Sequence, residues 1–442
     1  MKKICAALLA LAALLVFGPP VFGNGLNLNS LGTRALSMGG AFVGLADDFT
    51  SVFWNPAGLA RIRTATFGIA GSDIIPSGTY TLTVPPPYGT GTIIDTRTLT
   101  QHYLGGIAAY VHPISPDLVA AIGVFTPSGL GASWDGTKMS AVSGGRTDIE
   151  WKSRVGLVTI APTLAYRAGD AFSIGASLNL NYGMFDTSMY AGTADLTPLG
   201  LAYPAFDLGQ YQESETGWGL GATLGVQFRP SATLSFGAVL RTASTVKFRG
   251  SATIANIASL QAKGESDMRR EVTWPMWIAA GAAVVPLDGL TLTADIQWTQ
   301  WSKIQSITTS YLDPTWEALM TANGRNVLPM AWQDALQLRF GAEYRASADL
   351  VLRAGFYVDP SAAPDKTMNI LLPNYDFKGI TLGAGYNLGS LTLDFGLEYL
   401  IGAERSINPA LVATDPAYAY AVPGVYRMKI LVPSLSVTYR FD

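Results

Sequence analysis

The sequence predicts an all-β transmembrane barrel of about fourteen antiparallel strands, with a small N-terminal helical hatch that plugs the lumen. Three observations lead to this fold class. Charged residues are only 14% of the 442 residues and the mean hydropathy is +0.25, which indicates contact with lipid. Beyond the N-terminal leader, no apolar run reaches the roughly 18 residues of a membrane-spanning helix. Most of the chain alternates polar and apolar residues, and only a closed barrel of such strands satisfies every backbone group in hydrocarbon.

Residues 1–23 have the pattern of a secretory signal peptide. Two lysines precede an apolar stretch at 4–17, and modest side chains up to Gly23 offer a cleavage site. The one cysteine, Cys5, lies in this leader, so the mature chain is expected to have no thiol and no disulfide. The protein is therefore expected to be exported.

Polar and apolar residues alternate along most of the remaining chain. Between 172 and 181, for example, apolar residues alternate with Ser, Gly and Asn residues. Small polar residues suit a crowded barrel interior, whereas the exposed face of a soluble sandwich is usually richer in Lys and Glu. The alternation predicts strands at 64–75, 99–112, 117–127, 150–168, 171–190, 212–229, 232–250, 266–285, 290–306, 334–347, 349–360, 376–388, 390–402 and 425–441.

The connections between these strands alternate strictly between tight turns and long segments. Outer-membrane barrels have this pattern, with short periplasmic turns, long extracellular loops and both chain ends on the periplasmic side. A soluble sandwich has no reason to segregate loop length by end. The long segments are expected at 76–98, 128–149, 191–211, 251–265, 307–333, 361–375 and 403–424.

Several aromatic residues lie near the expected strand ends. Such residues form girdles at the two membrane interfaces of a barrel, although Trp and Tyr are also simply common in strands. The sequence leaves both interpretations open at each position. The residues are Trp274, Trp277, Trp298, Trp301, Tyr399, Tyr426 and Tyr439.

Residues 24–63 precede the first strand and are expected to form the hatch, followed by the barrel at 64–442. The stretch 35–46 suits a short helix, which its glycines weaken. Asp47 and Asp48 are good turn residues, and Asn55 is a helix cap with Pro56 in the first helical position. Because a wall of this width is not filled by its own side chains, we expect the hatch inside the lumen.

These N-terminal residues resemble the hatch of a known family. The matching motifs are Gly25-Leu26-Asn27-Leu28, Met38-Gly39-Gly40-Ala41-Phe42 and Asn55-Pro56-Ala57-Gly58-Leu59, and later segments such as Trp274-Pro275 are also similar. The family is FadL, the outer-membrane long-chain fatty acid transporters, with the related TodX-type aromatic hydrocarbon channels. The resemblance implies a fourteen-stranded barrel with an N-terminal plug. It also implies passive uptake of hydrophobic molecules by extracellular capture, hatch-gated passage and lateral release into the bilayer.

Two of the expected extracellular loops contain apolar residues where water should lie. Exposed apolar patches usually mark a binding surface, and the resemblance implies a low-affinity groove that captures the ligand there. The alternative is that the two loops pack on each other and only cap the barrel. The residues are Leu196, Leu199, Leu201, Phe206 and Leu208 in one loop, and Ile254, Ile257 and Leu260 in the other.

The resemblance also implies a lateral opening, made by an inward kink in the third strand. The matching stretch is Phe125-Thr126-Pro127-Ser128-Gly129. Pro127 cannot donate a ladder hydrogen bond and Gly129 tolerates unusual backbone angles, so strand pairing is expected to fail there. The hatch residues Asn55-Pro56-Ala57 are expected to face this gap and, with Asp47 and Asp48, to form the gate. An ordinary strand end is the alternative.

A ligand pocket is expected in the lumen, near Asn24, Leu26 and Leu28. A fatty acid would need a cation for its carboxylate, and Arg339 and Arg353 have lumen-side parity in their strands. Lumenal arginines also pair with neighbours such as Glu343. If no cation is free, an aromatic hydrocarbon is the better substrate.

Other function classes find little support in the sequence. A pI near 5.5 gives no basic footprint for nucleic acid, and no residue cluster indicates a metal or another cofactor. A lipid hydrolase would need a Ser–His pair, and the only histidines are His102 and His112. A general diffusion porin is the main alternative. We therefore expect a non-enzymatic, monomeric protein of the Gram-negative outer membrane, whose partners are hydrophobic small molecules, outer-membrane lipid and the barrel assembly machinery.

Overall fold

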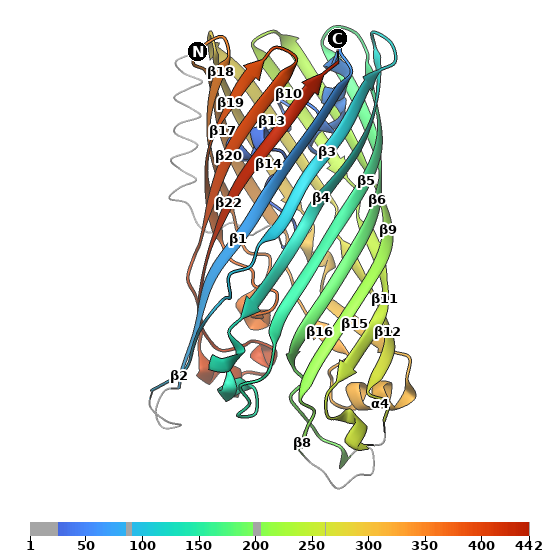
Figure 1. Cartoon of the computed structure of the whole chain (residues 1–442), viewed down its shortest axis with the longest axis vertical. Coiled ribbons are helices and arrows are strands. Elements are labelled where there is room, and N and C mark those ends of the chain that lie inside the picture. The colour runs from blue at the N-terminus through green and yellow to red at the C-terminus, as the bar shows by residue number, and fades with distance from the viewer. Residues whose placement is uncertain (1–24, 85–90, 198–204, 261, 442) are drawn as a thin grey trace.

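The chain folds into a closed antiparallel β-barrel of fourteen wall strands (Figure 1). The structure is a computed structural model that describes residues 25–84, 91–197, 205–260 and 262–441. The leader, Asn24, Leu199 and Leu201 lie outside the described residues. The first wall strand pairs with the last, from Thr66↔Arg440 to Thr81↔Val425, and this pairing closes the barrel. The predicted fold class is confirmed.

The wall is built from consecutive antiparallel neighbours, three of which are split into two pieces. The helices are short and lie in the N-terminal segment or in the long connections. The wall strands are β1 (Thr66–Val84), β3 (Tyr103–Pro113), β4 (Leu118–Trp134), β5 (Trp151–Arg167), β6 (Phe172–Tyr190), β9 (Gln210–Ser231), β10 (Leu234–Arg241) with β11 (Ser244–Ile254), β12 (Glu265–Trp274) with β13 (Trp277–Leu287), β14 (Leu290–Thr299) with β15 (Ser306–Tyr311), β17 (Ala335–Arg345), β18 (Leu350–Asp359), β19 (Phe377–Leu388), β20 (Leu391–Gly402) and β22 (Gly424–Arg440). The short strands are β2 (Gly91–Arg97), β7 (Thr193–Ala194), β8 (Phe206–Asp207), β16 (Val327–Pro329) and β21 (Arg405–Ile407). The helices are α2 (Thr33–Ser37), α3 (Ser51–Trp54), α4 (Pro314–Ala322) and α5 (Pro409–Thr414), and the 3₁₀ turns are η1 (Pro56–Arg61), η2 (Gly136–Lys138), η3 (Ser140–Val142), η5 (Ile257–Leu260), η6 (Trp301–Lys303), η7 (Asp365–Thr367) and η8 (Pro416–Tyr418).

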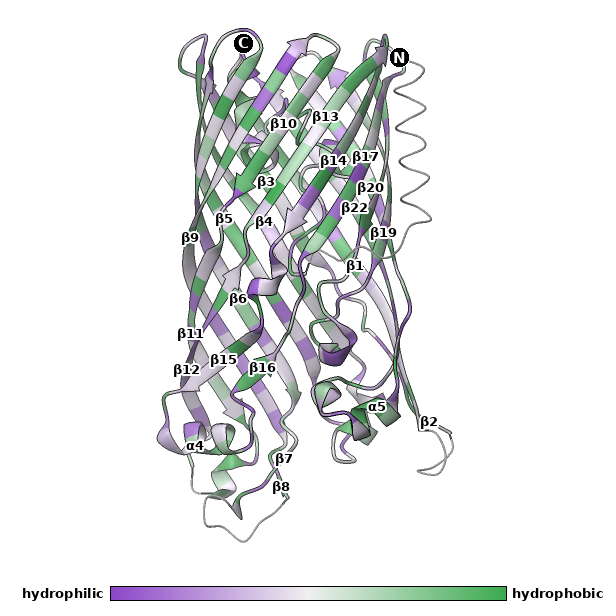
Figure 2. Ribbon diagram, turned by 180° about the vertical axis from the view of Figure 1, so that it is seen from behind, coloured by the Kyte–Doolittle hydropathy of each residue, from purple (hydrophilic) through white to green (hydrophobic). Residues whose placement is uncertain are grey.

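The two faces of the wall differ as the alternation predicts. In β6, Phe172 and Ile174 are exposed on the outer face, whereas Ser173 and Ser177 are buried on the inner face. Hydrophobic and hydrophilic residues accordingly alternate along the strands in Figure 2. The outer face is therefore suited to lipid and the inner face to a polar lumen. Among the described helices, none has the length and hydropathy needed to cross a membrane.

Several strands differ in extent from the prediction. The expected strands at 232–250, 266–285 and 290–306 are each interrupted. One interruption falls at Pro275, which has no N–H for the ladder. The first strand, by contrast, is longer than expected, because the prediction ended it before Pro76. It continues to Val84 because its outer part pairs with β22 on one side and β2 on the other.

Most of the aromatic residues expected in the interfacial girdles point into the barrel instead. Trp274, Trp277, Trp301 and Tyr426 are at most 5% exposed. In that set, only Tyr399 and Tyr439 are clearly exposed, with exposed fractions of 37% and 40%. The girdle interpretation is wrong for the four buried residues because their parity in or beside the strands turns them inward.

The N-terminal segment, residues 25–63, lies inside the barrel, toward the end that carries the C-terminus (Figure 1). Helix α2 contacts β18, β19, β20 and β22, whereas η1 contacts β4, β5, β6 and β9 on the other side of the wall. Asn55 caps η1 with Pro56 in its first turn, as predicted. The expected helix at 35–46 is reduced to α2, because Gly39 and Gly40 take positive φ values of 65° and 68° and end it.

Candidate binding cavity and lateral opening

The hydrogen-bonded seam between β3 and β4 is interrupted in the outer half of the wall. The two strands pair only as far as Ile107↔Phe125. The register of β4 against β5 then shifts between Phe125 and Ser128, so that an extra residue bulges at Thr126-Pro127. Within the described residues, the next bridge from this part of the chain to β4 is Thr98↔Trp134. The intervening edge of β4 therefore lacks a wall neighbour.

Residues 26–28 of the N-terminal segment fill this gap from inside. The N–H of Leu28 donates to the carbonyl of Pro127 over 3.0 Å, and the N–H of Gly129 donates to the carbonyl of Leu26 over 3.1 Å. The Ser128 hydroxyl also donates to the Leu26 carbonyl, and the Trp274 indole donates to the Ser128 hydroxyl. Residues 26–28 thus act as a short strand that completes the sheet where β3 leaves it.

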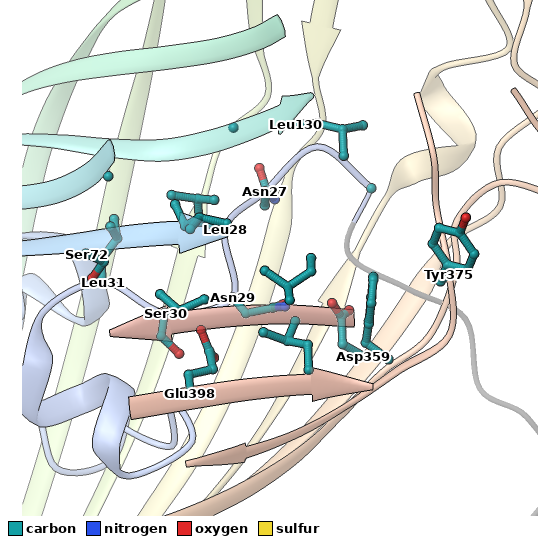
Figure 3. Close-up of a pocket in the computed structure, with 18 of the residues that line it drawn as sticks. Asn27, Leu28, Asn29, Ser30, Leu31, Ser72, Leu130, Asp359, Tyr375 and Glu398 are labelled. Atoms are coloured by element: carbon teal, nitrogen blue, oxygen red, sulfur yellow. The ribbon is translucent and has the colours of Figure 1, made fainter. Parts of the chain in front are cut away.

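A cavity lies directly beside these residues (Figure 3). It contains about 740 Å³ of unoccupied space, part of which is continuous with solvent. Apolar side chains form much of its wall, and its polar groups include Asp359, Glu398 and Tyr375. Burial raises the pKa of the Tyr375 phenol, which therefore stays neutral. The lining residues are Gly25, Asn27, Leu28, Asn29, Ser30, Leu31, Ser72, Ile74, Gly105, Gly129, Leu130, Asp359, Pro373, Asn374, Tyr375, Phe377, Glu398, Leu400, Ile430 and Val432.

Among the described residues, no basic side chain lines this cavity, which we call the main cavity. It does have two carboxyl groups, and that of Glu398 accepts a hydrogen bond of 2.7 Å from the Tyr357 hydroxyl. A ligand carboxylate placed there would approach these two carboxyl groups and no basic side chain of the lining, which is unfavourable in a buried site. The cavity is therefore suited to uncharged, largely apolar groups.

The two arginines expected in the pocket are engaged elsewhere. Arg339 donates to the carbonyls of Asn29 and Gly39 and to the side chain of Gln337. Arg353 pairs with Glu343 over 2.7 Å and with Asp394 over 2.6 Å. Neither lines the main cavity. Of the other expected pocket residues, Leu28 lines it, while Leu26 is buried beside the β3–β4 seam.

Asp47 and Asp48 belong to an ion-pair cluster near the short-turn end of the lumen. Arg34 of α2 contacts Asp47 over 2.6 Å and Asp48 over 3.4 Å. The same guanidinium binds Glu343 of β17 with two hydrogen bonds of 2.7 and 2.9 Å. Glu343 in turn binds Arg353, so the N-terminal segment is tied to the wall by alternating charges. We call Arg34, Asp47, Asp48, Glu343, Arg353 and Asp394 the Arg34 cluster.

The expectation that Asn55-Pro56-Ala57 faces the gap in the third strand is wrong. The Asn55 amide donates to the carbonyls of Val43 and Val226, and the turn packs on β6, β9 and β10. Glycines in those strands leave the room, since a Cβ at Gly225 would lie 2.1 Å from the Asn55 side-chain oxygen. The motif identifies a hatch segment but does not say which part of the wall receives it. Residues 26–28 occupy the gap instead.

The apolar loop residues do not form an open groove. Leu196, Leu208 and Ile257 are fully buried and Ile254 is 2% exposed, in a cluster with Trp316 of α4. Phe206 and Leu260 pack against this cluster, partly buried. Among the described residues, the loops therefore pack on each other and on α4. One signal for that helix in the sequence was overlooked: Asp313 caps it and Pro314 occupies its first turn.

This loop cluster predicts the result of placing a charge in it. We expect Leu196→Asp to open the loops locally, since an unpaired buried carboxylate is strongly unfavourable, while the barrel itself stays folded. Limited proteolysis of outer membranes should then cut the loop 191–211 faster than in the wild type. The matched control is Leu411→Asp, at an exposed residue of α5 in another loop. Equal cleavage of both variants would contradict the packing described here.

Apolar side chains connect the extracellular mouth with the β3–β4 seam. A second cavity at the mouth is lined by Met320, Leu328 and Leu372, together with polar residues. Leu372 also belongs to a buried cluster that contains Trp301 and Leu26, and Leu328 packs against that cluster. The mouth and residues 26–28 are therefore joined by continuous hydrophobic packing.

Comparison with known protein families adds to this geometry. The profile of the outer membrane protein transport protein family (OMPP1/FadL/TodX) matches residues 18–441. The chain belongs to this family. The OMPP1/FadL/TodX family consists of outer-membrane transporters of hydrophobic compounds, so the resemblance and the outer-membrane location predicted from the sequence are both confirmed.

Individual relatives in the family are distant but match along almost their whole length. Outer membrane protein P1 of Haemophilus influenzae is 22% identical over 479 residues, which cover 95% of this chain and 98% of the relative. A FadL homologue of Pseudomonas aeruginosa has a TM-score of 0.76 at 18% identity, covering 95% of this chain and 100% of its own. The Pseudomonas putida toluene transporter TodX has a TM-score of 0.70 at 16% identity, covering 96% and 100%. At these identities the structures show a shared fold.

The two histidines contact an aspartate and a tyrosine, and not a serine as a lipid hydrolase would require. His102 contacts Asp73 over 2.7 Å, and His112 contacts the hydroxyl of Tyr110 over 3.2 Å. Within the described residues, no group of three side chains is arranged to hold a metal ion. Members of the family are transport channels, which favours a channel over a hydrolase.

Proposed function

We propose that this protein is a channel for passive uptake of hydrophobic molecules across the outer membrane. Residues 24–63 would form its hatch and residues 64–442 its barrel. The observation that carries the proposal is the interrupted β3–β4 seam, which the hatch residues 26–28 close from inside. Withdrawal of these residues would connect the main cavity with the lipid outside the wall. Phe125-Thr126-Pro127-Ser128-Gly129 would then be the edge of a lateral opening.

The proposed route begins at the extracellular mouth. Capture is assigned to the mouth cavity with Met320 and Leu328, because the apolar loop residues that the structure describes are buried or partly buried. From there the ligand would pass along the cluster that contains Trp301 and reach the main cavity beside Leu28. Each buried methylene stabilises the bound ligand by about 0.8 kcal/mol, so capture needs no residue-specific chemistry.

The main cavity favours an uncharged ligand or the uncharged part of one. Asp359 and Glu398 would repel a carboxylate, and Arg339 and Arg353 are engaged by other protein groups. An aromatic hydrocarbon would bring no charge into this cavity, whereas a fatty acid would have to keep its carboxylate elsewhere. TodX, one of the structural neighbours, is described as a toluene transporter.

Uptake by whole cells tests this function. We expect cells that carry the gene to take up labelled toluene faster than cells from which it is deleted. Labelled oleate is measured in parallel to compare the two ligand classes. Equal uptake of both compounds by the two strains would reject transport of these ligands.

Single-channel recording separates this proposal from a general diffusion porin. With the hatch in place, we expect low conductance to small ions in planar bilayers, because the N-terminal segment crosses the lumen from β4 to β22. A high, stable conductance of the unmodified protein would favour the porin and contradict the proposal.

A further inference from the structure

A partly buried arginine with no carboxylate partner among the described residues lies on the other side of residues 26–28. Arg241 ends β10, and its guanidinium is 4.6 Å from the ring centre of Phe53, 5.1 Å from Trp277 and 5.7 Å from Phe125. It donates to the carbonyl of Phe53 over 3.1 Å and to the hydroxyl of Thr223 over 3.2 Å. Within the described residues it forms no ion pair.

The hydrogen bonds of Arg241 leave much of its capacity unused. A guanidinium has five N–H donors, always carries its charge and prefers the two oxygens of a carboxylate. The contacts above use the Nε donor and one donor of Nη2. Aromatic faces stabilise a cation modestly compared with a charged partner. A cation in this position is therefore able to accept an anion without first giving up an ion pair.

Arg241 also borders a cavity that could hold such an anion. This cavity, which we call the head-group cavity, is separate from the main cavity and contains about 410 Å³ of unoccupied space, part of which is continuous with solvent. Asn27 lines both cavities, and Pro127 of the kink lines this one. Polar side chains surround the arginine, and indole and proline rings complete the wall. The lining includes Asn27, Pro127, Asn179, Arg241, Trp274 and Trp277.

One polar atom of the lining also lacks a partner. The side-chain oxygen of Asn179 is buried and accepts no hydrogen bond from the described protein atoms, although its amide donates to Thr223. Buried polar atoms are normally paired with protein or water. An unpaired acceptor requires a hydrogen-bond donor such as a water molecule, so the capacity of this place to bind an anion rests on the unused donors of Arg241.

We propose that Arg241 binds the carboxylate of an amphipathic ligand beside the lateral opening. The inference rests on the proposed function, which brings hydrophobic molecules to residues 26–28. It extends that function from uncharged molecules to acids, whose carboxylate the main cavity would repel. The head-group cavity neutralises the carboxylate, and its indole and proline rings contact the adjoining part of the apolar chain.

Binding to the purified full-length protein tests this assignment independently of transport. The protein is reconstituted in lipid nanodiscs and titrated with 9,10-dibromostearate and with its methyl ester, whose bromine atoms quench the fluorescence of nearby tryptophans. We expect Arg241→Gln to weaken binding of the acid about tenfold or more, as loss of a charge-assisted hydrogen bond requires. Binding of the ester should change less than about twofold. Arg241→Lys keeps the charge and should recover part of the affinity for the acid.

The control distinguishes this site from a general loosening of the hatch. Arg339→Gln also removes a lumenal arginine that donates to the N-terminal segment, but Arg339 lines neither cavity. It should leave the ratio of acid to ester affinity unchanged. Equal weakening of acid and ester by Arg241→Gln, or no weakening of either, would overturn the assignment. So would a change of the ratio in Arg339→Gln. Failure of toluene and oleate uptake, by contrast, would reject the transport function and not this binding site.

Discussion

A disulfide between cysteines placed at Asn27 and Ser128 is expected to stop uptake of hydrophobic ligand, and reduction should restore it. The two residues face each other in an antiparallel bridge, flanked by the hydrogen bonds of Leu28 and Gly129. That arrangement is a non-hydrogen-bonded pair, whose Cα atoms lie about 4.5 Å apart and within the range for a disulfide. The bond would fix residues 26–28 across the β3–β4 seam. Toluene uptake should then fall to the level of the deletion strain.

No natural cysteine has to be removed for this experiment, because the only one in the sequence is Cys5 in the leader. Each single-cysteine variant should transport normally. A second cysteine pair at Tyr110 and Ile122 joins β3 and β4 where they are already paired on the lipid face. That cross-link should leave uptake unchanged. If the Asn27–Ser128 disulfide forms and uptake continues, ligand does not leave through the seam.

Replacement of Glu343 by alanine is expected to release the hatch and make the channel leak. Glu343 binds both Arg34 and Arg353, so its removal leaves two nearby guanidinium groups without their shared partner. Loss of one partner from a largely buried ion pair costs about 3 kcal/mol, which corresponds to about a hundredfold change in an equilibrium. We expect frequent large conductance steps in planar bilayers and greater sensitivity of cells to large antibiotics such as vancomycin.

Glu404→Ala is the matched control for the Arg34 cluster. Glu404 pairs with Arg427 over 2.6 Å, but both side chains are about half exposed. Exposed pairs of this kind contribute roughly 0–1 kcal/mol, so conductance should match the wild type. A closed channel in Glu343→Ala would show that packing of the hatch, and not this ion-pair cluster, keeps it in place.

Much of the architecture could be predicted because it depends on local patterns. Period-two alternation is visible within each strand, and loop lengths alternate along the chain, so the barrel and the orientation of its ends follow without any long-range contact. The same reasoning ended two strands too early, at Pro76 and at Pro127. A proline removes one donor, but a strand continues if its other edge is paired, as β1 and β4 show.

The candidate site was less predictable because its geometry depends on partners far apart in the sequence. Leu26 gives no sign that its carbonyl meets Ser128, and nothing around Arg34 points to Glu343. The position of Arg339 in the strand alternation correctly predicted that its side chain faces the lumen. The alternation does not reveal which carbonyls the side chain binds there. Arg241 was overlooked for the same reason, since its isolation from carboxylates is a property of the assembled barrel.

The contacts of residues 25–63 have a consequence for the order of folding. This segment leaves the ribosome and enters the periplasm before any wall strand, yet its partners lie up to 401 residues later, as in the Thr33–Ser434 hydrogen bond. Contacts so distant in the sequence form slowly, because a long loop must close first. The N-terminal segment is therefore made first and fixed last. Its few, short helices suit that order. A segment with little structure of its own can remain unfolded until the barrel closes and brings together the wall residues that it contacts.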